Sequence, residues 1–166
     1  MTSRTKLKQS PEKTDTSPAH CLCGAVEIEI DVPAFWAWHD HSKETQIAHG
    51  AAYATYVGCW RKKVRVVKGA DAIATFAPID GKSERSFCKR CGTPLFYARN
   101  RAAKMVNLPR ALFSGRTGRE PRYHIGLEQA PEWAYAQEPL KPLKGYPGVL
   151  VVRNPKAKKR ETDPFG

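Results

Sequence analysis

Long hydrophobic runs are missing from this sequence. Its 166 residues include no apolar stretch close to the roughly 20 residues that a transmembrane helix needs. The N-terminus lacks the hydrophobic region of a secretion signal. A glycine-rich phosphate loop is absent too, which removes the support for that class of nucleotide site. These absences predict a cytoplasmic protein without a membrane partner.

Cysteine is scarce, with five residues, but four of them form two short clusters, Cys21-Leu22-Cys23-Gly24 and Cys88-Lys89-Arg90-Cys91-Gly92. The two cysteines of each cluster are too close for an easy disulfide, whereas four thiolates on two turns suit a tetrahedral zinc ion. The alternative is four reduced cysteines that pack as small hydrophobic side chains. We predict one structural Zn²⁺, held by Cys21, Cys23, Cys88 and Cys91.

Acidic residues are few relative to basic ones, and the formal net charge is +12. Much of the basic charge lies in two polar ends, which predicts a disordered basic leader at 1–17 and a disordered basic tail at 153–166. Between them, 18–152 is predicted to be a single zinc-binding β domain. Its basic runs at 61–65 and 99–101 either form solvated surface or attract an anion.

Short segments with alternating or β-branched apolar residues dominate the middle of the chain. Strands are expected over 24–31, 51–60, 64–67, 72–77, 93–98 and 104–108, with turns between them. A polar connection is expected after Glu44, with Gly50 near its end. The pattern predicts an all-β fold of several short antiparallel strands in more than one sheet.

Several of these motifs together resemble one known family. They are C-x-C-G at 21–24, opening a strand, the run Ser86-Phe87-Cys88-Lys89-Arg90-Cys91-Gly92-Thr93-Pro94-Leu95, and a His-Ile pair at 124–125 before a tryptophan. This combination resembles the glutathione-dependent formaldehyde-activating enzymes and centromere protein V, over about 19–148. The resemblance implies a zinc-knotted β-tent and a carbon–sulfur lyase-type reaction on S-hydroxymethylglutathione. It also implies two zinc ions, one structural and one catalytic.

The chain departs from the family pattern at the catalytic zinc, and is in that sense a divergent member. The family's C-x-C-x-x-C cluster corresponds here to His39-x-His41-x-x-Glu44, with Ser42 retained and Thr45 in place of the usual basic residue. Two imidazoles and a carboxylate can hold zinc or iron and leave positions open. We therefore predict His39, His41 and Glu44 as catalytic residues and as ligands of a second metal. The alternative is a histidine pair that is solvated or lies at the edge of the core.

Five further residues have two interpretations each. His49 is a fourth ligand or a proton shuttle, and His124 is a shuttle or a structural strand residue. Cys59 is a reactive thiol or a core residue. Trp38, with its neighbour Trp36, lines a pocket or belongs to the core.

Two functions follow. The first is a metal-dependent lyase-type enzyme whose partner is a small-molecule thiol or aldehyde, such as glutathione. The second is an inactive zinc-binding module that binds nucleic acid or another polyanion through its basic surface.

Overall fold

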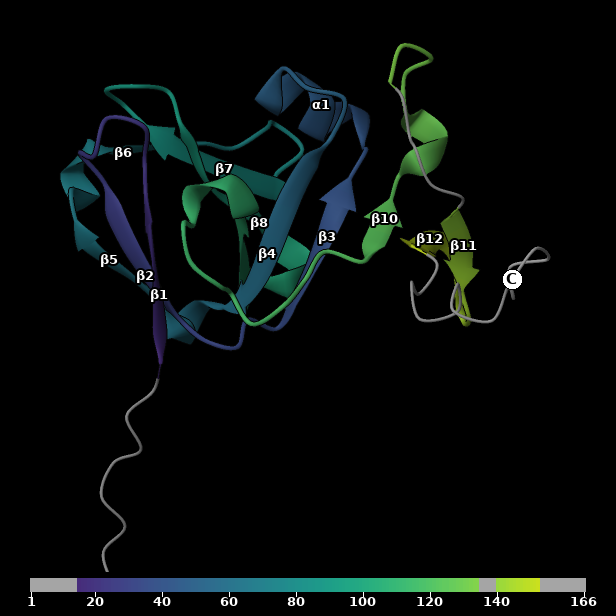
Figure 1. Cartoon of the computed structure of the whole chain (residues 1–166). Helices are drawn as coiled ribbons and strands as arrows, with labels where there is room; N and C mark the ends of the chain where they lie inside the picture. Colours follow the sequence, from purple (N-terminus) through teal and green to yellow (C-terminus); the bar gives the residue numbers. More distant parts are fainter. Residues whose placement is uncertain (1–14, 135–139, 153–166) are drawn as a thin grey trace, which may run out of the picture.

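The computed structural model describes residues 15–134 and 140–152 (Figure 1). The strands are β1 Thr16–His20, β2 Glu27–Asp31, β3 Trp36–Asp40, β4 Ala54–Trp60, β5 Val64–Lys68, β6 Ile73–Phe76, β7 Ser83–Cys88, β8 Pro94–Arg99, β9 Met105–Pro109, β10 Tyr123–Ile125, β11 Leu140–Leu143 and β12 Tyr146–Val152. The α-helix is α1 Lys43–His49, and short 3₁₀ turns cover Arg61–Lys63, Ala70–Ala72, Asn100–Ala102, Arg110–Leu112 and Leu127–Gln129.

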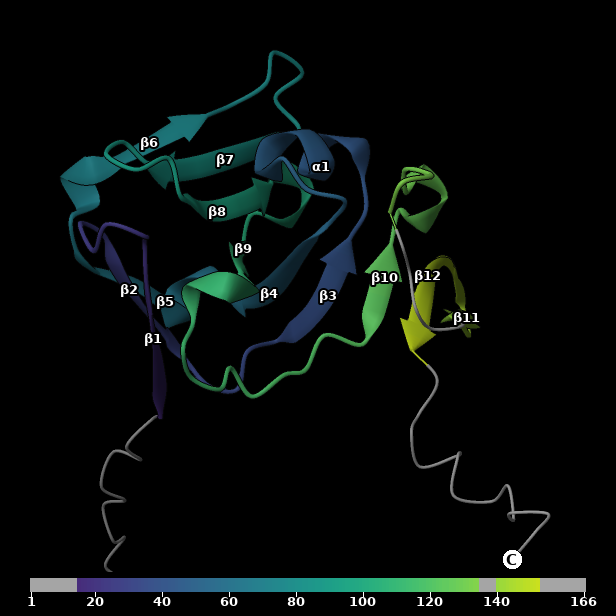
Figure 2. The same cartoon turned by 45° about the horizontal axis from the view of Figure 1, so that its top comes forward.

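The strands form two sheets, and the prediction of an all-β fold with antiparallel strands is confirmed. The smaller sheet has the order β1-β2-β5 and the larger one β11-β12-β10-β3-β4-β9-β8-β7-β6. The pairing of β10 with β3 is parallel, whereas the other strand pairs are antiparallel. Figure 2 shows β10 beside β3. The helix α1 lies between the end of β3 and the start of β4. Within the described residues, no helix is long and apolar enough to cross a membrane.

The first boundary of the predicted domain is wrong. Strand β1 begins at Thr16, inside the segment predicted as a disordered leader at 1–17. The reason is pairing, because Ser17 lies opposite Ile30 and is buried, so this polar stretch covers one edge of β2. Residues 1–14 and the predicted tail at 153–166 lie outside the described residues.

The polar connection expected after Glu44 is also wrong, since that stretch belongs to α1, which ends at His49. Ser42 occupies the N-cap position, although its side chain makes no capping hydrogen bond, and Glu44 places negative charge in the first turn, where the helix dipole favours it. Gly50 ends the helix in a left-handed conformation with φ 59°. These signals fix a short helix although its apolar periodicity is weak.

Two clusters of buried side chains cover the two faces of the larger sheet. Alternate residues of a strand point to opposite faces, so Ala37 and Val57 join the main core with the smaller sheet, whereas Trp38 and Tyr56 join a second cluster that contains Tyr97. Near the end of β3, the two faces of the larger sheet therefore carry different groups of side chains. The candidate site residues divide between these two faces.

Candidate metal centre and basic hollow

The four predicted zinc ligands lie together. Cys21 and Cys23 follow β1, Cys88 ends β7, and Cys91 lies in the turn to β8. All four sulfur atoms fall within 4.8 Å of one another, with 3.6 Å between Cys21 and Cys23 and 3.9 Å between Cys23 and Cys88. Sulfurs about 2.3 Å from a tetrahedral zinc ion are roughly 3.8 Å apart. The cluster therefore fits zinc, and it links the smaller sheet to the larger one.

Backbone groups shape each half of this cysteine cluster. Gly24 and Gly92 adopt left-handed conformations with φ 69° and 71°, which glycine reaches without the strain of a Cβ. The N–H of Val26 donates to the sulfur of Cys21 at 3.3 Å. Such donors stabilise thiolate rather than thiol, as a metal ligand requires.

The electrostatics of the cysteines also favour a bound cation. Hydrogen bonds from the Thr93 side chain and backbone lower the pKa of Cys91 to about 5. At Cys23 the backbone N–H of Ala25 lowers the pKa, but burial and the neighbouring cysteines outweigh it and raise the pKa to about 11. Four sulfurs this close oppose one another's ionisation, and a divalent cation removes that conflict.

His39 lies on the face of the larger sheet that looks away from Tyr56. Its partner across β4 is Thr55, and the His39 Nδ1 atom lies 2.9 Å from the Thr55 hydroxyl. Its partner across β10 is His124, whose ring centroid is 4.5 Å away. Parallel pairing thus brings together two histidines that are distant in sequence.

His41 joins the same group just beyond the end of β3. Its Nε2 atom lies 2.9 Å from Nδ1 of His124, and its ring lies against that of Tyr53, tilted by 35°, with 4.9 Å between centroids. The His41 side chain is 4% exposed, and its other nitrogen, Nδ1, is buried with no hydrogen-bond partner among the described residues. We call His39, His41 and His124 the histidine cluster.

All three histidines are held in the neutral form. Burial, with the nearby charge of His124, lowers the pKa of His39 to about 4. Burial, with the nearby charge of His41, lowers the pKa of His124 to about 4. Burial also lowers the pKa of His41. At neutral pH each imidazole therefore has one unprotonated nitrogen, and one ring of the His41–His124 pair uses it to accept the hydrogen bond from the other.

Glu44, the third predicted ligand of the second metal, does not lie with the histidines. It is exposed in the first turn of α1 and lines a hollow of about 590 Å³ on the Tyr97 side of the sheet. Across residues 15–134 and 140–152, the four cysteines form the single group of three or more metal-ligating residues with atoms within 4.8 Å. The structure thus brings His39 and His41 together without Glu44.

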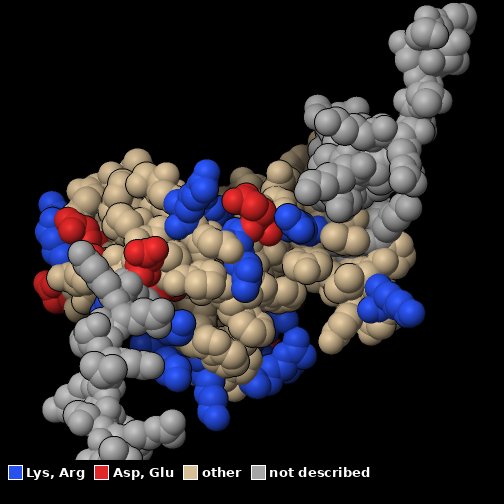
Figure 3. All heavy atoms as spheres, turned by 60° about the horizontal axis from the view of Figure 1, so that its bottom comes forward, with Lys and Arg blue, Asp and Glu red and all other residues tan. Residues whose placement is uncertain are grey.

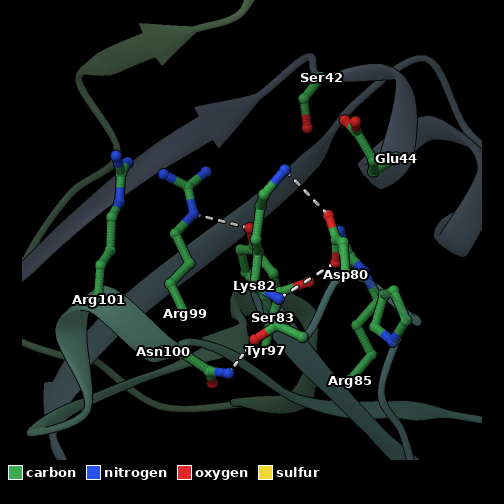
Figure 4. Close-up of a pocket in the computed structure, with 12 residues that line it drawn as sticks. Ser42, Glu44, Asp80, Lys82, Ser83, Arg85, Tyr97, Arg99, Asn100 and Arg101 are labelled. Carbon is green, nitrogen blue, oxygen red and sulfur yellow. Dashed lines mark hydrogen bonds and ion pairs between the residues drawn. The ribbon is translucent and has the colours of Figure 1, made fainter.

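The hollow itself is strongly basic, and we call it the basic hollow (Figure 4). Its charged lining residues are Glu44, Asp80, Lys82, Arg85, Arg99 and Arg101. In Figure 4 the side chains of Arg99 and Arg101 point into the space below Ser42 and Glu44. Its location was not predicted, although the basic run at 99–101 was the sequence signal that could have indicated it.

Two of these arginines are fixed by aromatic side chains. Arg85 donates to the Tyr56 hydroxyl at 3.0 Å and to the Thr45 hydroxyl at 3.2 Å, and its guanidinium lies 4.3 Å from the Tyr97 ring centroid. Arg99 donates from Nε to the Tyr97 hydroxyl at 2.7 Å. The fold therefore holds two guanidinium groups in place before any ligand arrives.

The remaining singled-out residues have mainly structural positions. His49 lies 2.8 Å from the Tyr56 hydroxyl, on the opposite face from the histidine cluster. Cys59 is 2% exposed in the main core, and burial raises its pKa to about 12. Trp38 is 3% exposed and packs on Trp36 at 4.6 Å between ring centroids.

Comparisons with known proteins agree with the motifs. Residues 16–129 match the family model described as glutathione-dependent formaldehyde-activating enzyme. The chain is also similar to a Rhodobacter sphaeroides protein of known crystal structure, with a TM-score of 0.50 and 21% sequence identity. That likeness covers 60% of this chain and 89% of the other, and it supports the fold.

Proposed function

Because the chain belongs to the glutathione-dependent formaldehyde-activating enzyme family, we propose that it joins formaldehyde to glutathione and releases it again. In the forward direction a new carbon–sulfur bond forms between the thiol and the aldehyde carbon. The thiol proton ends on the former carbonyl oxygen. The reverse direction is the carbon–sulfur lyase reaction, and it breaks the same bond.

The observation that supports this substrate is the basic hollow. Its volume of about 590 Å³ lies within the roughly 300–1,000 Å³ typical of small-molecule sites. Glutathione has two carboxylates and one ammonium group. Guanidinium groups bind carboxylates through paired hydrogen bonds, so Arg99 and Arg101 suit its carboxylates and Glu44 suits its ammonium group.

The cysteine cluster is suited to structure rather than to the reaction. With four thiolates around one ion no coordination position remains for substrate. The reaction therefore requires the second metal, which we place at the histidine segment, where His39 and His41 are neutral and share a face. A zinc or iron ion bound there would lower the pKa of a thiol and stabilise developing negative charge on oxygen.

The protein's own groups would bind and orient the substrate. Arg85 is held by hydrogen bonds from two directions, so it can fix a carboxylate with little loss of side-chain entropy. Ser42 lines the basic hollow and directly follows His41 in the chain. The hollow thus reaches the segment that directly follows His41, but from the face of the sheet opposite to the histidine cluster.

The test is exchange NMR on purified protein with glutathione and formaldehyde. We expect faster exchange between free glutathione and its hydroxymethyl adduct than in buffer, and a smaller acceleration for the His41→Ala variant. Exchange at the uncatalysed rate in metal-replete protein would rule out the proposed reaction.

A further inference from the structure

The topology gives the histidine cluster a member that the motif does not contain. His41 and His124 are separated by 83 positions, yet they meet because β10 pairs in parallel with β3 and places His124 opposite His39. Tyr123 and Ile125, the neighbours of His124, pack against the second buried cluster with Trp38. By alternation, His124 faces the other side, where His39 lies.

The separation between two imidazole nitrogens matches that of ligands around a metal. Nε2 of His41 and Nδ1 of His124 are 2.9 Å apart. Nitrogen ligands about 2.1 Å from a tetrahedral ion are roughly 3.4 Å apart. An opening of about half an ångström, with the shared proton moved to the other nitrogen of its own ring, would convert the present hydrogen-bonded pair into a pair of ligands. The ring of His39 lies next to both as the nearest third imidazole.

Glu44 faces a different environment. It lines the basic hollow on the Tyr97 side of the sheet, together with Arg85 and Arg99. Its carboxylate therefore shares a hollow with guanidinium groups, on the face of the sheet opposite to the histidine cluster.

We propose that His124 and His41 are protein ligands of the second metal ion and that Glu44 is not one. This inference rests on the proposed function, which places a metal at the histidine segment. It replaces the carboxylate of the sequence motif with an imidazole from β10. It also frees Glu44 for the substrate ammonium group and leaves coordination positions open on the metal.

The experiment uses the full chain with the cysteine cluster loaded with zinc, titrated with Co²⁺. We expect one further equivalent of cobalt to bind, with visible bands but without the absorption that thiolate ligands give. His124→Ala and His41→Ala should each weaken cobalt binding at least tenfold. Glu44→Gln should leave the affinity unchanged within twofold. His49→Ala, a matched histidine control on the opposite face, should do the same.

The inference is overturned if Glu44→Gln weakens cobalt binding as much as His124→Ala, or if wild-type protein takes up no second equivalent. A measurement on wild-type protein covers the case in which a histidine variant fails to keep its zinc. Bound Co²⁺ should shift the ring-proton NMR signals of His41 and His124, and unshifted signals would contradict the assignment. Cobalt binding without thiol–formaldehyde exchange would instead reject the proposed function and leave this inference standing.

Discussion

At the scale of single residues, the arginines of the basic hollow differ in how firmly the fold holds them. Arg85 has hydrogen bonds to Tyr56 and Thr45, so removing its side chain would disturb the second buried cluster as well as binding. Arg101 is exposed at the rim of the hollow. It is therefore the position at which substrate binding can be tested without loss of stability.

We expect Arg101→Gln to weaken glutathione binding about fivefold, because an exposed ion contact contributes up to about 1 kcal/mol. Isothermal titration calorimetry with glutathione measures the change, and thermal melting should show no loss of stability. Arg116→Gln is the matched control, since Arg116 is also exposed but lines a different hollow with Phe35 and Trp36. Equal weakening by both variants would point to general charge attraction instead of a specific site.

The chemistry of Cys59 is decided by its burial. With 2% exposure and a pKa raised to about 12, its thiol is almost entirely protonated at neutral pH, and the thiolate is the reactive form. We expect iodoacetamide to leave Cys59 unmodified in native zinc-loaded protein and to modify it after denaturation, as read by peptide mass spectrometry. Rapid labelling of native protein at Cys59 would contradict the core assignment.

At the scale of elements, the alternation along β3 and β4 explains why the motif His39-x-His41-x-x-Glu44 indicated only part of the histidine cluster. The sequence indicated that His39 and His41 share a face, and it indicated from their spacing that four cysteines form one cluster. It could not indicate that β10 would pair in parallel with β3, because that register depends on residues about 85 positions away. His124 was thus identified as a titratable residue but not as a neighbour of His41.

The separation of Glu44 from the histidines has a similar cause. An extended segment from His39 followed by a turn would let the Glu44 carboxylate close the face formed by the two histidines. The helix α1 begins at Lys43 and places Glu44 at the basic hollow instead. Its signals were local, namely Ser42 and Gly50 at the two ends, but a seven-residue helix has too little apolar periodicity to stand out.

Close packing between β3 and β4 gives a test of this arrangement. A Cβ added at Gly58 would lie 2.6 Å from Cδ1 of Trp36 and 3.2 Å from the ring of Trp38. We expect Gly58→Ala to destabilise the protein by about 1–3 kcal/mol, as overpacking of a core does, in urea unfolding followed by tryptophan fluorescence. Gly148→Ala is the control, because its Cβ would meet nothing within 4 Å. Equal stability of both variants would mean that the tryptophans do not pack on β4 as described.

At the scale of the whole molecule, the cysteine cluster connects the two sheets. The sulfurs of Cys23 and Cys88 are 65 positions apart in sequence and 3.9 Å apart in space. We expect Cys88→Ser to lose the structural zinc and to destabilise the protein by more than about 4 kcal/mol, the range in which loss of a structural metal belongs. Metal analysis and thermal melting measure both effects. Cys59→Ala should keep its zinc, and a Cys88→Ser protein as stable as wild type would show that the ion is not structural.

The net charge of +12 bears on the alternative function, an inactive zinc-binding module that binds nucleic acid or another polyanion. Nine of the 28 basic residues lie at 1–14 and 153–166. Figure 3 shows lysine and arginine side chains scattered over the face it displays, most densely in its lower half. Trp60, Arg61, Lys62, Lys63 and Lys104 line one basic and aromatic hollow of about 920 Å³. This distribution favours non-specific attraction of a polyanion over a site that reads sequence.

We therefore expect retardation of DNA in a gel at low salt that disappears by about 200 mM salt, since each phosphate contact contributes about 0.9 to the slope of log K against log salt. A variant with Lys156, Lys158, Lys159 and Arg160 changed to Gln should show a shallower slope, because neutral residues release no counterions. The same variant should retain thiol–formaldehyde exchange, since the basic hollow is unchanged. Retardation that persists at 200 mM salt and discriminates between sequences would favour the nucleic-acid module over the enzyme.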